Sequence, residues 1–370
     1  MRSMICGIML LSFGLSTLFG QATPPASTMD AVHVIEGSIS PKSIGFSGKG
    51  LFFAQNMMYQ HTVTVYDRSF QTVKTLSDQV SLKAYRQPGY AGKHRGAPVE
   101  VAFSPDGAYA FVSNYKMYGQ GFDHPVSDNC GTVKEGDPSF VYQINTKSLR
   151  IERVIKVGCV PKYVAVSPNG KFLLVSNWCS ADLSVVDIAQ GKEVQRVAMG
   201  RYPRGIVVDS ESYYAYVAIM GGKKVARVNL QDFSVSYITQ VGKTPRHLVL
   251  GPHGRYLYIT LSREGNIVKY DLQRERMVGK VYSGAAARSM VMSQDGRFLY
   301  VVNYHDDTFS KVDARTMQLL ETHPTRDKPI GITYDPQTGQ VWVACYSGSI
   351  MIFTDRQMND PMQDALAISP

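Results

Sequence analysis

The strongest constraint on the fold is a repeat that covers most of the 370-residue chain. Six segments superpose without a gap, and they begin at Pro98, Pro161, Pro203, Pro245, Ala287 and Pro329. The last five of these starts are 42 residues apart each time, and a seventh segment from Pro41 fits after one deletion. Self-similarity at a fixed period of this length indicates a repeat architecture rather than two or three unrelated domains.

Each unit has the pattern of several short β-strands. A short apolar strand leads to a turn, as at residues 104–107 and 167–170, where proline and glycine set the turn geometry, and a second strand rich in valine, tyrosine and phenylalanine follows. A third strand ends in aspartate or asparagine, and a fourth leads to a Gly-x-x-Pro linker. Four antiparallel strands in about 40–45 residues is the period of a propeller blade.

Seven such units predict an all-β fold, a seven-bladed β-propeller of four-stranded antiparallel blades. The seventh unit has only three strands before a polar tail, which we expect over residues 356–370. Residues 32–41 match the fourth strand and linker of an earlier unit, residues 194–203. We therefore expect the N-terminal strand to join the last blade and close the ring, in a single propeller domain over residues 30–355.

The units resemble those of the bacterial YVTN β-propeller family, which read roughly P-x-x-V-A-V-S-P-D-G-x-x-L-Y-V-S-N. The match is best in the units that begin at Pro98, Pro161 and Ala287, and the unit from Pro203 departs from the pattern at its turn. The resemblance covers nearly everything after the N-terminal segment. It implies a secreted seven-bladed architecture, and it leaves the function to be argued from individual sites.

The N-terminus has the pattern of a secretory signal. One arginine precedes an apolar run over residues 4–19, and small residues follow at Gly20 and Ala22. This pattern predicts a signal peptide over residues 1–22 and a periplasmic or secreted location. A membrane anchor fits less well because the run is short and is interrupted by glycine and serine. We expect no membrane span in the mature chain.

Two insertions break the repeat, one within residues 77–97 and one within residues 115–139. In an up-and-down blade both of these connections emerge at the same end of the ring, so we expect both insertions to crown one face. Insertions on one face of a repeat architecture often mark its binding face. The alternative is loop drift, because long surface loops cost little stability.

A cation follows the opening proline, or its equivalent, in five of the seven units. These residues predict a basic ring around the central mouth: Lys42, Lys162, Arg204, Arg246 and Arg288. A ring of charges in a concave site focuses its field on an anion, and arginine can bind a carboxylate or phosphate through two parallel hydrogen bonds. The net charge of +9 also favours anionic partners. Alternatively, these side chains only solvate the mouth.

Amide and aromatic residues follow the second strand of several units. They are candidate ligand contacts on the rim of the same face: Asn114, Tyr115, Asn177, Trp178, Asn303, Tyr304 and Tyr346. This chemistry suits sugars, peptides or bases, although the asparagines can instead cap local turns. Basic and aromatic residues also alternate over residues 83–95, a pattern that predicts binding of single-stranded nucleic acid in vitro.

Histidines and cysteines on this face give candidate metal and disulfide sites. Imidazole is a transition-metal ligand, and three histidines map around the first two units, although their spacing fits no compact motif: His61, His94 and His124. A disulfide from Cys130 to Cys159 or to Cys179 would restrict the second insertion. We expect Cys345 to be a buried free thiol.

No nucleophile elbow, phosphate loop or pair of carboxylates at fixed spacing stands out, and no cysteine pair with histidine for heme attachment occurs. We therefore expect an exported, non-catalytic binding or scaffolding propeller without a cofactor. Its partners would be an anionic small molecule, a glycan or an envelope protein, and it would be a monomer. The alternative is a metal- or cofactor-dependent enzyme or redox partner, including a lactonase-like hydrolase, that uses the same face.

Overall fold

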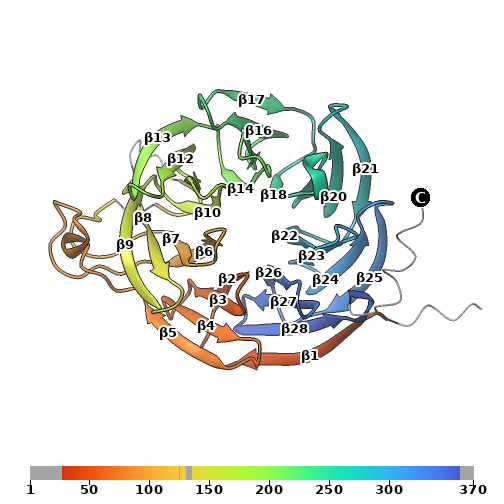
Figure 1. The fold of residues 1–370 in the computed structure, drawn as a ribbon, viewed down its shortest axis with the longest axis horizontal. Helices are drawn as coiled ribbons and strands as arrows, with labels where there is room; N and C mark the ends of the chain where they lie inside the picture. The colour runs from red at the N-terminus through yellow and green to blue at the C-terminus, as the bar shows by residue number, and fades with distance from the viewer. Residues whose placement is uncertain (1–26, 125, 131–135, 359–370) are drawn as a thin grey trace, which may run out of the picture.

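The computed structural model describes residues 27–124, 126–130 and 136–358, and these form seven four-stranded antiparallel sheets around a central axis (Figure 1). This arrangement confirms the predicted seven-bladed all-β propeller. In six of the blades the strands are paired in chain order. The first strand of each of these blades lies nearest the axis and the fourth lies at the outside (Figure 1).

The strands of the first three blades follow one another along the chain. The first blade contains β2 (Pro41–Phe46), β3 (Leu51–Asn56), β4 (Thr62–Asp67) and β5 (Thr72–Ser77). The second contains β6 (Pro98–Phe103), β7 (Tyr109–Asn114), β8 (Ser139–Asn145) and β9 (Arg150–Val157). The third contains β10 (Pro161–Val166), β11 (Phe172–Asn177), β12 (Asp182–Asp187) and β13 (Lys192–Ala198).

The next three blades repeat this order. The fourth blade contains β14 (Pro203–Val208), β15 (Tyr214–Ile219), β16 (Lys224–Asn229) and the short β17 (Val235–Ile238). The fifth contains β18 (Pro245–Leu250), β19 (Tyr256–Leu261), β20 (Asn266–Asp271) and β21 (Arg276–Tyr282). The sixth contains β22 (Ala287–Met292), β23 (Phe298–Asn303), β24 (Thr308–Asp313) and β25 (Gln318–Pro324).

The seventh blade is built from both ends of the described chain. It contains β26 (Pro329–Asp335), β27 (Gln340–Cys345), β28 (Ser349–Asp355) and, at the outside, β1 (Met29–Glu36). Strand β1 pairs antiparallel with β28, from Met29 opposite Asp355 to Glu36 opposite Ser349. The prediction that the N-terminal strand closes the ring is therefore confirmed.

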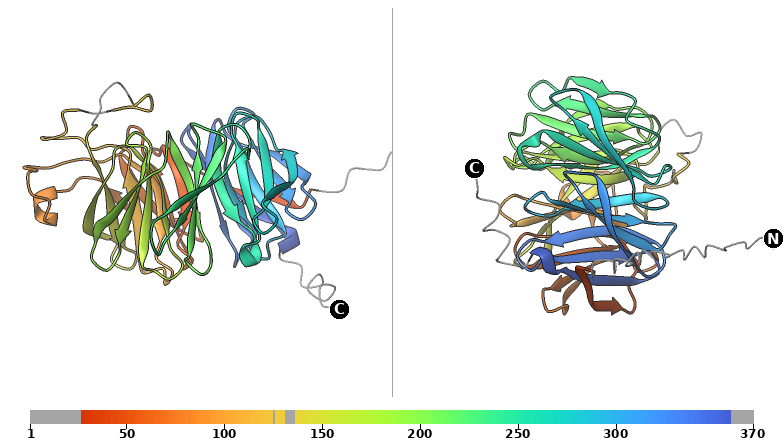
Figure 2. Two further views of the ribbon diagram at one scale, coloured as in Figure 1. Left: turned by 90° about the horizontal axis from the view of Figure 1, so that it is seen from above. Right: turned by 90° about the vertical axis from the view of Figure 1, so that its right-hand side faces the viewer.

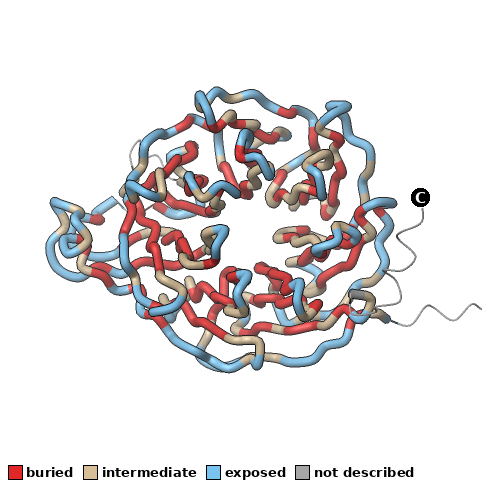
Figure 3. Tube along the Cα trace, in the orientation of Figure 1, coloured by how far each residue is buried: buried red, intermediate tan, exposed pale blue. Residues whose placement is uncertain are grey.

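Burial explains why these segments form blades. The second strand of each blade is almost wholly buried, whereas most residues of the outermost strands are exposed to solvent, as the burial patterns of β11 and β13 show. Figure 3 shows the same gradient, with buried segments within the blades and exposed ones along the outer edge. Apolar side chains fill the spaces between neighbouring blades, for example where Phe52 of the first blade stacks on Trp342 of the seventh at 3.8 Å between ring centroids.

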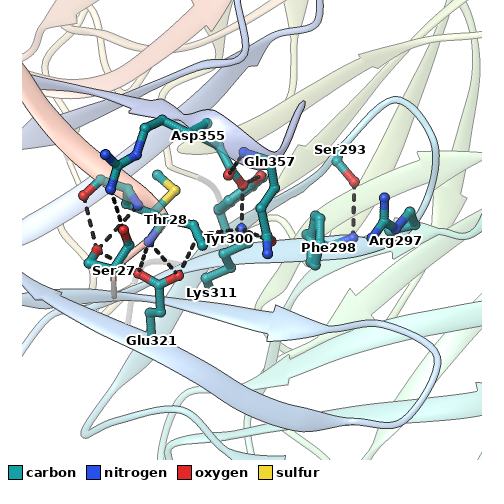
Figure 4. A network of polar contacts seen from close by, with 12 residues as sticks. Ser27, Thr28, Ser293, Arg297, Phe298, Tyr300, Lys311, Glu321, Asp355 and Gln357 are labelled. Carbon is teal, nitrogen blue, oxygen red and sulfur yellow. Dashed lines mark hydrogen bonds and ion pairs between the residues drawn. The ribbon is translucent and has the colours of Figure 1, made fainter. Parts of the chain in front are cut away.

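A buried ionic network lies where the chain ends join the ring (Figure 4). The Lys311 ammonium in β24 and the Asp355 carboxylate at the end of β28 are 2.6 Å apart, and both side chains are inaccessible to solvent. The hydroxyl of Tyr300 donates to the same carboxylate at 2.6 Å. Lys311 also donates to Thr28, so the sixth blade, the seventh blade and the N-terminal segment share one network.

Glu321 in β25 forms a second contact to the N-terminal segment (Figure 4). Its carboxylate accepts the Thr28 backbone N–H at 3.1 Å, the Ser27 hydroxyl at 2.7 Å and the Thr28 hydroxyl. Burial alone would raise the pKa of Glu321, but these hydrogen bonds lower it to about 2. The carboxylate is therefore stabilised in its charged form by the two residues that precede the strand that closes the ring.

The two insertions lie side by side on the first two blades. The first contains the 3-10 helix η1 (Leu82–Tyr85), and an isolated bridge pairs Arg95 of the first with Tyr118 of the second. Both project from the ring in Figure 2. Two further 3-10 helices are η2 (Pro252–Gly254) and η3 (Arg356–Met358).

The predicted signal peptide over residues 1–22 lies outside the described residues, as does most of the predicted tail. Within the described part of the chain, no helix has the length and apolar character needed to cross a bilayer.

We expect the variant Asp355→Asn to lose roughly 3–5 kcal/mol of unfolding free energy, because it leaves the Lys311 ammonium buried without its counter-ion. Urea unfolding of the two proteins at pH 7 measures the difference. The matched control is Glu36→Gln, which breaks the exposed pair with Arg326 and should cost less than about 1 kcal/mol. Equal effects of the two substitutions would contradict the structural importance of the buried pair.

The lowered pKa of Glu321 predicts how stability depends on pH. A carboxyl whose pKa falls from its ordinary value of 4.5 to about 2 on folding stabilises the fold above about pH 4.5. This contribution is lost as the pH falls from about 4.5 to about 2. Melting temperatures of the wild type and of Glu321→Gln should therefore converge over this interval, and parallel curves would refute the assignment.

Candidate functional site

A cavity of about 570 Å³ lies on the propeller axis, and residues from all seven blades line it. Six blades contribute the second residue of their innermost strand, and the second blade contributes its insertions and linker. Cavities of this size hold small ligands and cofactors, and in repeat folds they form where equivalent positions converge. The cavity is therefore the candidate functional site.

The five cations of the basic ring all line this cavity: Lys42, Lys162, Arg204, Arg246 and Arg288. Each is the second residue of an innermost strand, so the rotation that relates the blades brings the five together. Lys42, Lys162 and Arg204 are buried, with 5–7% of their surface exposed. The repeat pattern predicts these residues near the central mouth, and in the structure they line the wall of the cavity with little of their surface exposed.

Two carboxylates pair with cations of the ring. Glu100 in β6 lies 3.9 Å from the Lys42 ammonium and 3.9 Å from the Arg204 guanidinium. Asp128 of the second insertion lies 2.5 Å from the Lys162 ammonium. Sequence reasoning missed Glu100, although an acidic residue follows Val99 in a unit that lacks the usual cation. Cations still outnumber carboxylates in the described wall of the cavity.

Burial and like charges act on the ring cations together. The pKa of Lys42 lies well below its usual range because of burial and because Arg204 repels it, although Glu100 works in the opposite direction. For Arg246, burial and the neighbouring Arg204 and Arg288 likewise lower the pKa. The ring thus carries electrostatic strain that an anion in the cavity would relieve.

Arg246 and Arg288 are the ring members without an ion pair among the described residues. The Arg288 guanidinium lies 3.3 Å from the centroid of the Tyr304 ring, and its Nε atom is buried with no protein hydrogen-bond partner. Arg246 donates to the sulfur of Met220 at 4.0 Å, a weak interaction. Because buried N–H groups almost always have an acceptor, the Arg288 Nε atom and the neighbouring Arg246 guanidinium are the candidate positions for an anion in this cavity.

Aromatic rings complete the wall. Tyr115, Trp178, Tyr304 and Tyr346 of the predicted rim all line the cavity. The Lys162 ammonium lies 4.3 Å from the centroid of the Tyr115 ring, a cation–π contact. The cavity therefore combines positive charge with flat apolar surfaces, which suits a planar anionic ligand.

The interpretation of Asn114, Asn177 and Asn303 as ligand contacts on the rim is wrong. All three side chains are fully buried, and their amide groups donate to neighbouring strands of their own blades. Asn303, for example, donates to the hydroxyls of Thr308 and Ser310 at 3.0 and 2.9 Å. These residues join the strands of a blade, so the aromatic neighbour that follows each of them is the one that faces the cavity.

The loop between β3 and β4 adds four residues to the cavity: Met57, Met58, Tyr59 and His61. This loop is one residue longer than the loop between β11 and β12. Within it, Tyr59 and His61 have positive φ angles of 62° and 51°. The Nδ1 atom of His61 lies 2.6 Å from the carbonyl oxygen of Gly96. This hydrogen bond orients the ring and leaves Nε2 for another partner.

The three candidate metal-binding histidines do not come together. His94 is buried, with Nε2 at 3.0 Å from the Gln120 carbonyl oxygen, and His124 is exposed near Asp137. Over the described ranges, no group of three or more histidine, cysteine, aspartate or glutamate side chains could hold a metal ion. Only His61 of the three lines the central cavity.

A disulfide joins Cys130 of the second insertion to Cys179, which follows β11. Cys159 and Cys345 are buried free thiols. The disulfide lies next to Trp178 of the cavity wall, so it ties the second insertion to the rim of the site.

Comparison with known proteins gives two findings. A protein-family model described as "Cytochrome D1 heme domain" matches residues 246–347, less than half of the chain. The fold is also similar to a solved structure titled "Kuenenia stuttgartiensis Hydrazine Synthase", with a TM-score of 0.67 and 17% sequence identity over 86% of this chain and 96% of that one. This likeness concerns the fold alone. No curated protein matches the sequence.

The family match contradicts the expectation of a non-catalytic binding or scaffolding propeller without a cofactor. It favours the alternative, a cofactor-dependent enzyme or redox partner that uses the same face. The expectation was wrong because it relied on the absence of a sequence motif for heme attachment. The missing cysteine pair excludes only covalent attachment of heme, whereas a group held by charge, stacking and one axial ligand needs no contiguous motif.

The environment of Lys162 predicts a measurable titration. Burial and Arg204 lower its pKa to about 8, although Asp128 opposes the shift. In protein labelled with ¹³C at the lysine ε-carbon, one NMR signal should therefore titrate near pH 8. Lys280, which is half exposed and paired with Glu264, serves as the reference lysine. A spectrum in which every lysine titrates above pH 10 would contradict this environment.

Proposed function

We propose that the protein binds a heme-type tetrapyrrole in the central cavity and acts in a redox reaction. The observation that carries the proposal is the excess of cations over carboxylates in an aromatic-walled cavity, where three of the cations are buried and Arg246 and Arg288 have no ion pair among the described residues. The segment matched by the cytochrome D1 heme family supports it, because residues 246–347 include Arg246, Arg288, Tyr304 and Tyr346 of this wall.

The residues of the cavity fit such a group. A heme is a flat macrocycle that carries carboxylates, and Arg246 and Arg288 have no carboxylate partner among the described residues. The buried Nε of Arg288 lacks a hydrogen-bond acceptor, which a ligand carboxylate would provide. Tyr304, which lies against that guanidinium, and Tyr346 offer planar surfaces beside it.

Side chains that would ligate the iron of such a group lie in the loop between β3 and β4. Heme iron in proteins is held by histidine, methionine, cysteine or tyrosine, and this loop brings two methionines, a tyrosine and a histidine to the cavity. His61 is the best candidate because its Nδ1 is bonded to the Gly96 carbonyl oxygen. A metal-ligating imidazole is commonly oriented by a hydrogen bond from its other ring nitrogen to a carbonyl or carboxylate oxygen.

A bound heme supplies one-electron redox chemistry. The chain itself would hold the carboxylates through Arg246 and Arg288 and would orient His61 through the Gly96 carbonyl oxygen. At the residues that follow Lys162 and Arg246 in their strands, the Tyr163 hydroxyl and the His247 Nε2 atom are 3.3 Å apart, a contact between the third and fifth blades. Glu100 lies at the same level and partly neutralises Lys42 and Arg204.

We further propose that the chain is an exported member of the YVTN-type propellers, with a signal peptide over residues 1–22 and one propeller domain over residues 30–355. The N-terminal sequence pattern and the Cys130–Cys179 disulfide support export, because disulfides persist in oxidising compartments such as the periplasm. Two expectations stay predictions: that the partner is a glycan, an envelope protein or single-stranded nucleic acid, and that the protein is a monomer.

Titration of the purified protein with iron protoporphyrin IX tests the proposal. We expect a saturable one-to-one change in the Soret absorbance. The double variant Arg246→Met/Arg288→Met should weaken binding about 100-fold, because each lost charged hydrogen bond costs about tenfold, or about 1.4 kcal/mol. His61→Ala should change the Soret maximum of the complex.

The matched control is the double variant Arg274→Met/Arg276→Met. It removes two exposed guanidinium groups, one in the turn before β21 and one at the first residue of β21. It should bind the porphyrin like the wild type. Absence of saturable binding, or equal affinities of the two double variants, would overturn the proposal.

A further inference from the structure

The second insertion brings a carboxylate to the basic ring. Asp128 lies 2.5 Å from the Lys162 ammonium, and the Tyr115 hydroxyl donates to the same carboxylate oxygen at 2.8 Å. The Lys162 side chain is 8% exposed and that of Asp128 is 67% exposed. Asp128 thus approaches from the solvent side and covers a cation that belongs to the wall of the cavity.

The chain around Asp128 is held in this position by three contacts. The indole N–H of Trp178 donates to the Asp128 carbonyl oxygen at 2.8 Å. Val126 packs in a small apolar cluster with Cys159 and Val160. Two residues after Asp128, the disulfide joins Cys130 to Cys179. The disulfide is the only covalent link among these contacts.

The position of Asp128 sets it apart from Glu100. Glu100 lies within the ring and belongs to a core strand, so it is a permanent counter-ion. Asp128 belongs to an insertion outside the repeat, is mostly exposed, and bonds to one cation of the cavity wall, Lys162. A carboxylate at this place makes the interaction that an anionic ligand would make with Lys162.

We propose that Asp128 is an internal competitor of the anionic ligand for Lys162, and that the Cys130–Cys179 disulfide keeps it in place. The inference rests on the proposed function in so far as the same cavity takes the ligand. When the disulfide is closed, Asp128 is present at Lys162 at a high effective concentration. When it is open, this advantage falls, and Lys162 joins Arg246 and Arg288 as a cation free for the ligand.

The opening step is a reduction by a dithiol. The Cys130–Cys179 sulfur–sulfur bond breaks, two thiols form, and the dithiol is oxidised to a disulfide, so that two electrons and two protons are transferred. The bonded cysteines line a second cavity of about 760 Å³, through which a small dithiol can reach them. Cys159 also lines this second cavity, but burial raises the pKa of its thiol to about 11. Because the thiolate is the nucleophile in thiol–disulfide exchange, Cys159 attacks the Cys130–Cys179 disulfide poorly at neutral pH.

The reactivity of Lys162 toward an acylating reagent tests the inference without any cavity ligand. Wild-type protein is treated with a limiting amount of acetyl succinimidyl ester before and after reduction with dithiothreitol, and acetylation is quantified by peptide mass spectrometry. We expect reduction to raise the rate at Lys162 about tenfold, while Lys280 stays constant as the surface reference.

Variants assign this effect to Asp128. Asp128→Asn should show the fast rate already when oxidised and should not respond further to dithiothreitol. The matched control is Asp123→Asn, which removes the same charge from an exposed position of the same insertion and should behave like the wild type. Cys130→Ser/Cys179→Ser should show the fast rate without reductant.

Two results would overturn the inference: a rate at Lys162 that is unchanged by reduction, or an equal response to dithiothreitol in Asp128→Asn and the wild type. Failure of porphyrin binding would refute the heme proposal and leave these rates unaffected, so the two proposals fail separately. If both hold, reduction of the wild type should also raise its porphyrin affinity by about the same factor.

Discussion

The pairing of β1 with β28 is the interaction on which the rest of this structure depends. A four-stranded blade has two faces to bury, and a row of blades buries them all only when the last blade meets the first. Here the chain ends share the seventh blade, and the buried pair of Lys311 and Asp355 joins that closure to the sixth blade. On the other side, Arg68 of the first blade binds Asp335 of the seventh through two hydrogen bonds. Closure also fixes the distance of every innermost strand from the axis.

Closure of the ring explains how single cations in separate blades, all at the same position of the repeat, produce a basic cavity. A lysine or arginine after a proline is unremarkable in one blade, where it would face solvent. In a closed ring the same position recurs at the axis, and five cations line one cavity. Burial among like charges is costly, and the described carboxylates offset only part of it. This unbalanced positive charge at the centre of the fold is the premise of both the proposed heme site and the role proposed for Asp128.

The errors of the sequence interpretation have a common physical origin. Asn114, Asn177 and Asn303 occupy the last position of a strand, where sequence alone does not distinguish a side chain that turns toward the cavity from one that bonds its own blade. The expectation of a scaffold without a cofactor, which the family match contradicts, rested on the absence of a heme-attachment motif, and heme that is bound without covalent attachment needs no contiguous motif. The loop over residues 57–61 went unnoticed apart from His61, because one extra residue in a loop is a weak signal until its position beside the axis is known.

The sequence by itself determined the number of blades, the four strands in each and the closure by the N-terminal strand. These features follow from periodicity and turn chemistry, which are local and repeat along the chain. It also identified the five cations that line the axis. Only the tertiary structure decided what surrounds them: Glu100 within the ring, Asp128 on Lys162, and the choice of Cys179 as the partner of Cys130. Such contacts join residues distant in sequence, and their geometry is set by blade rotation and insertion packing, which no local pattern encodes.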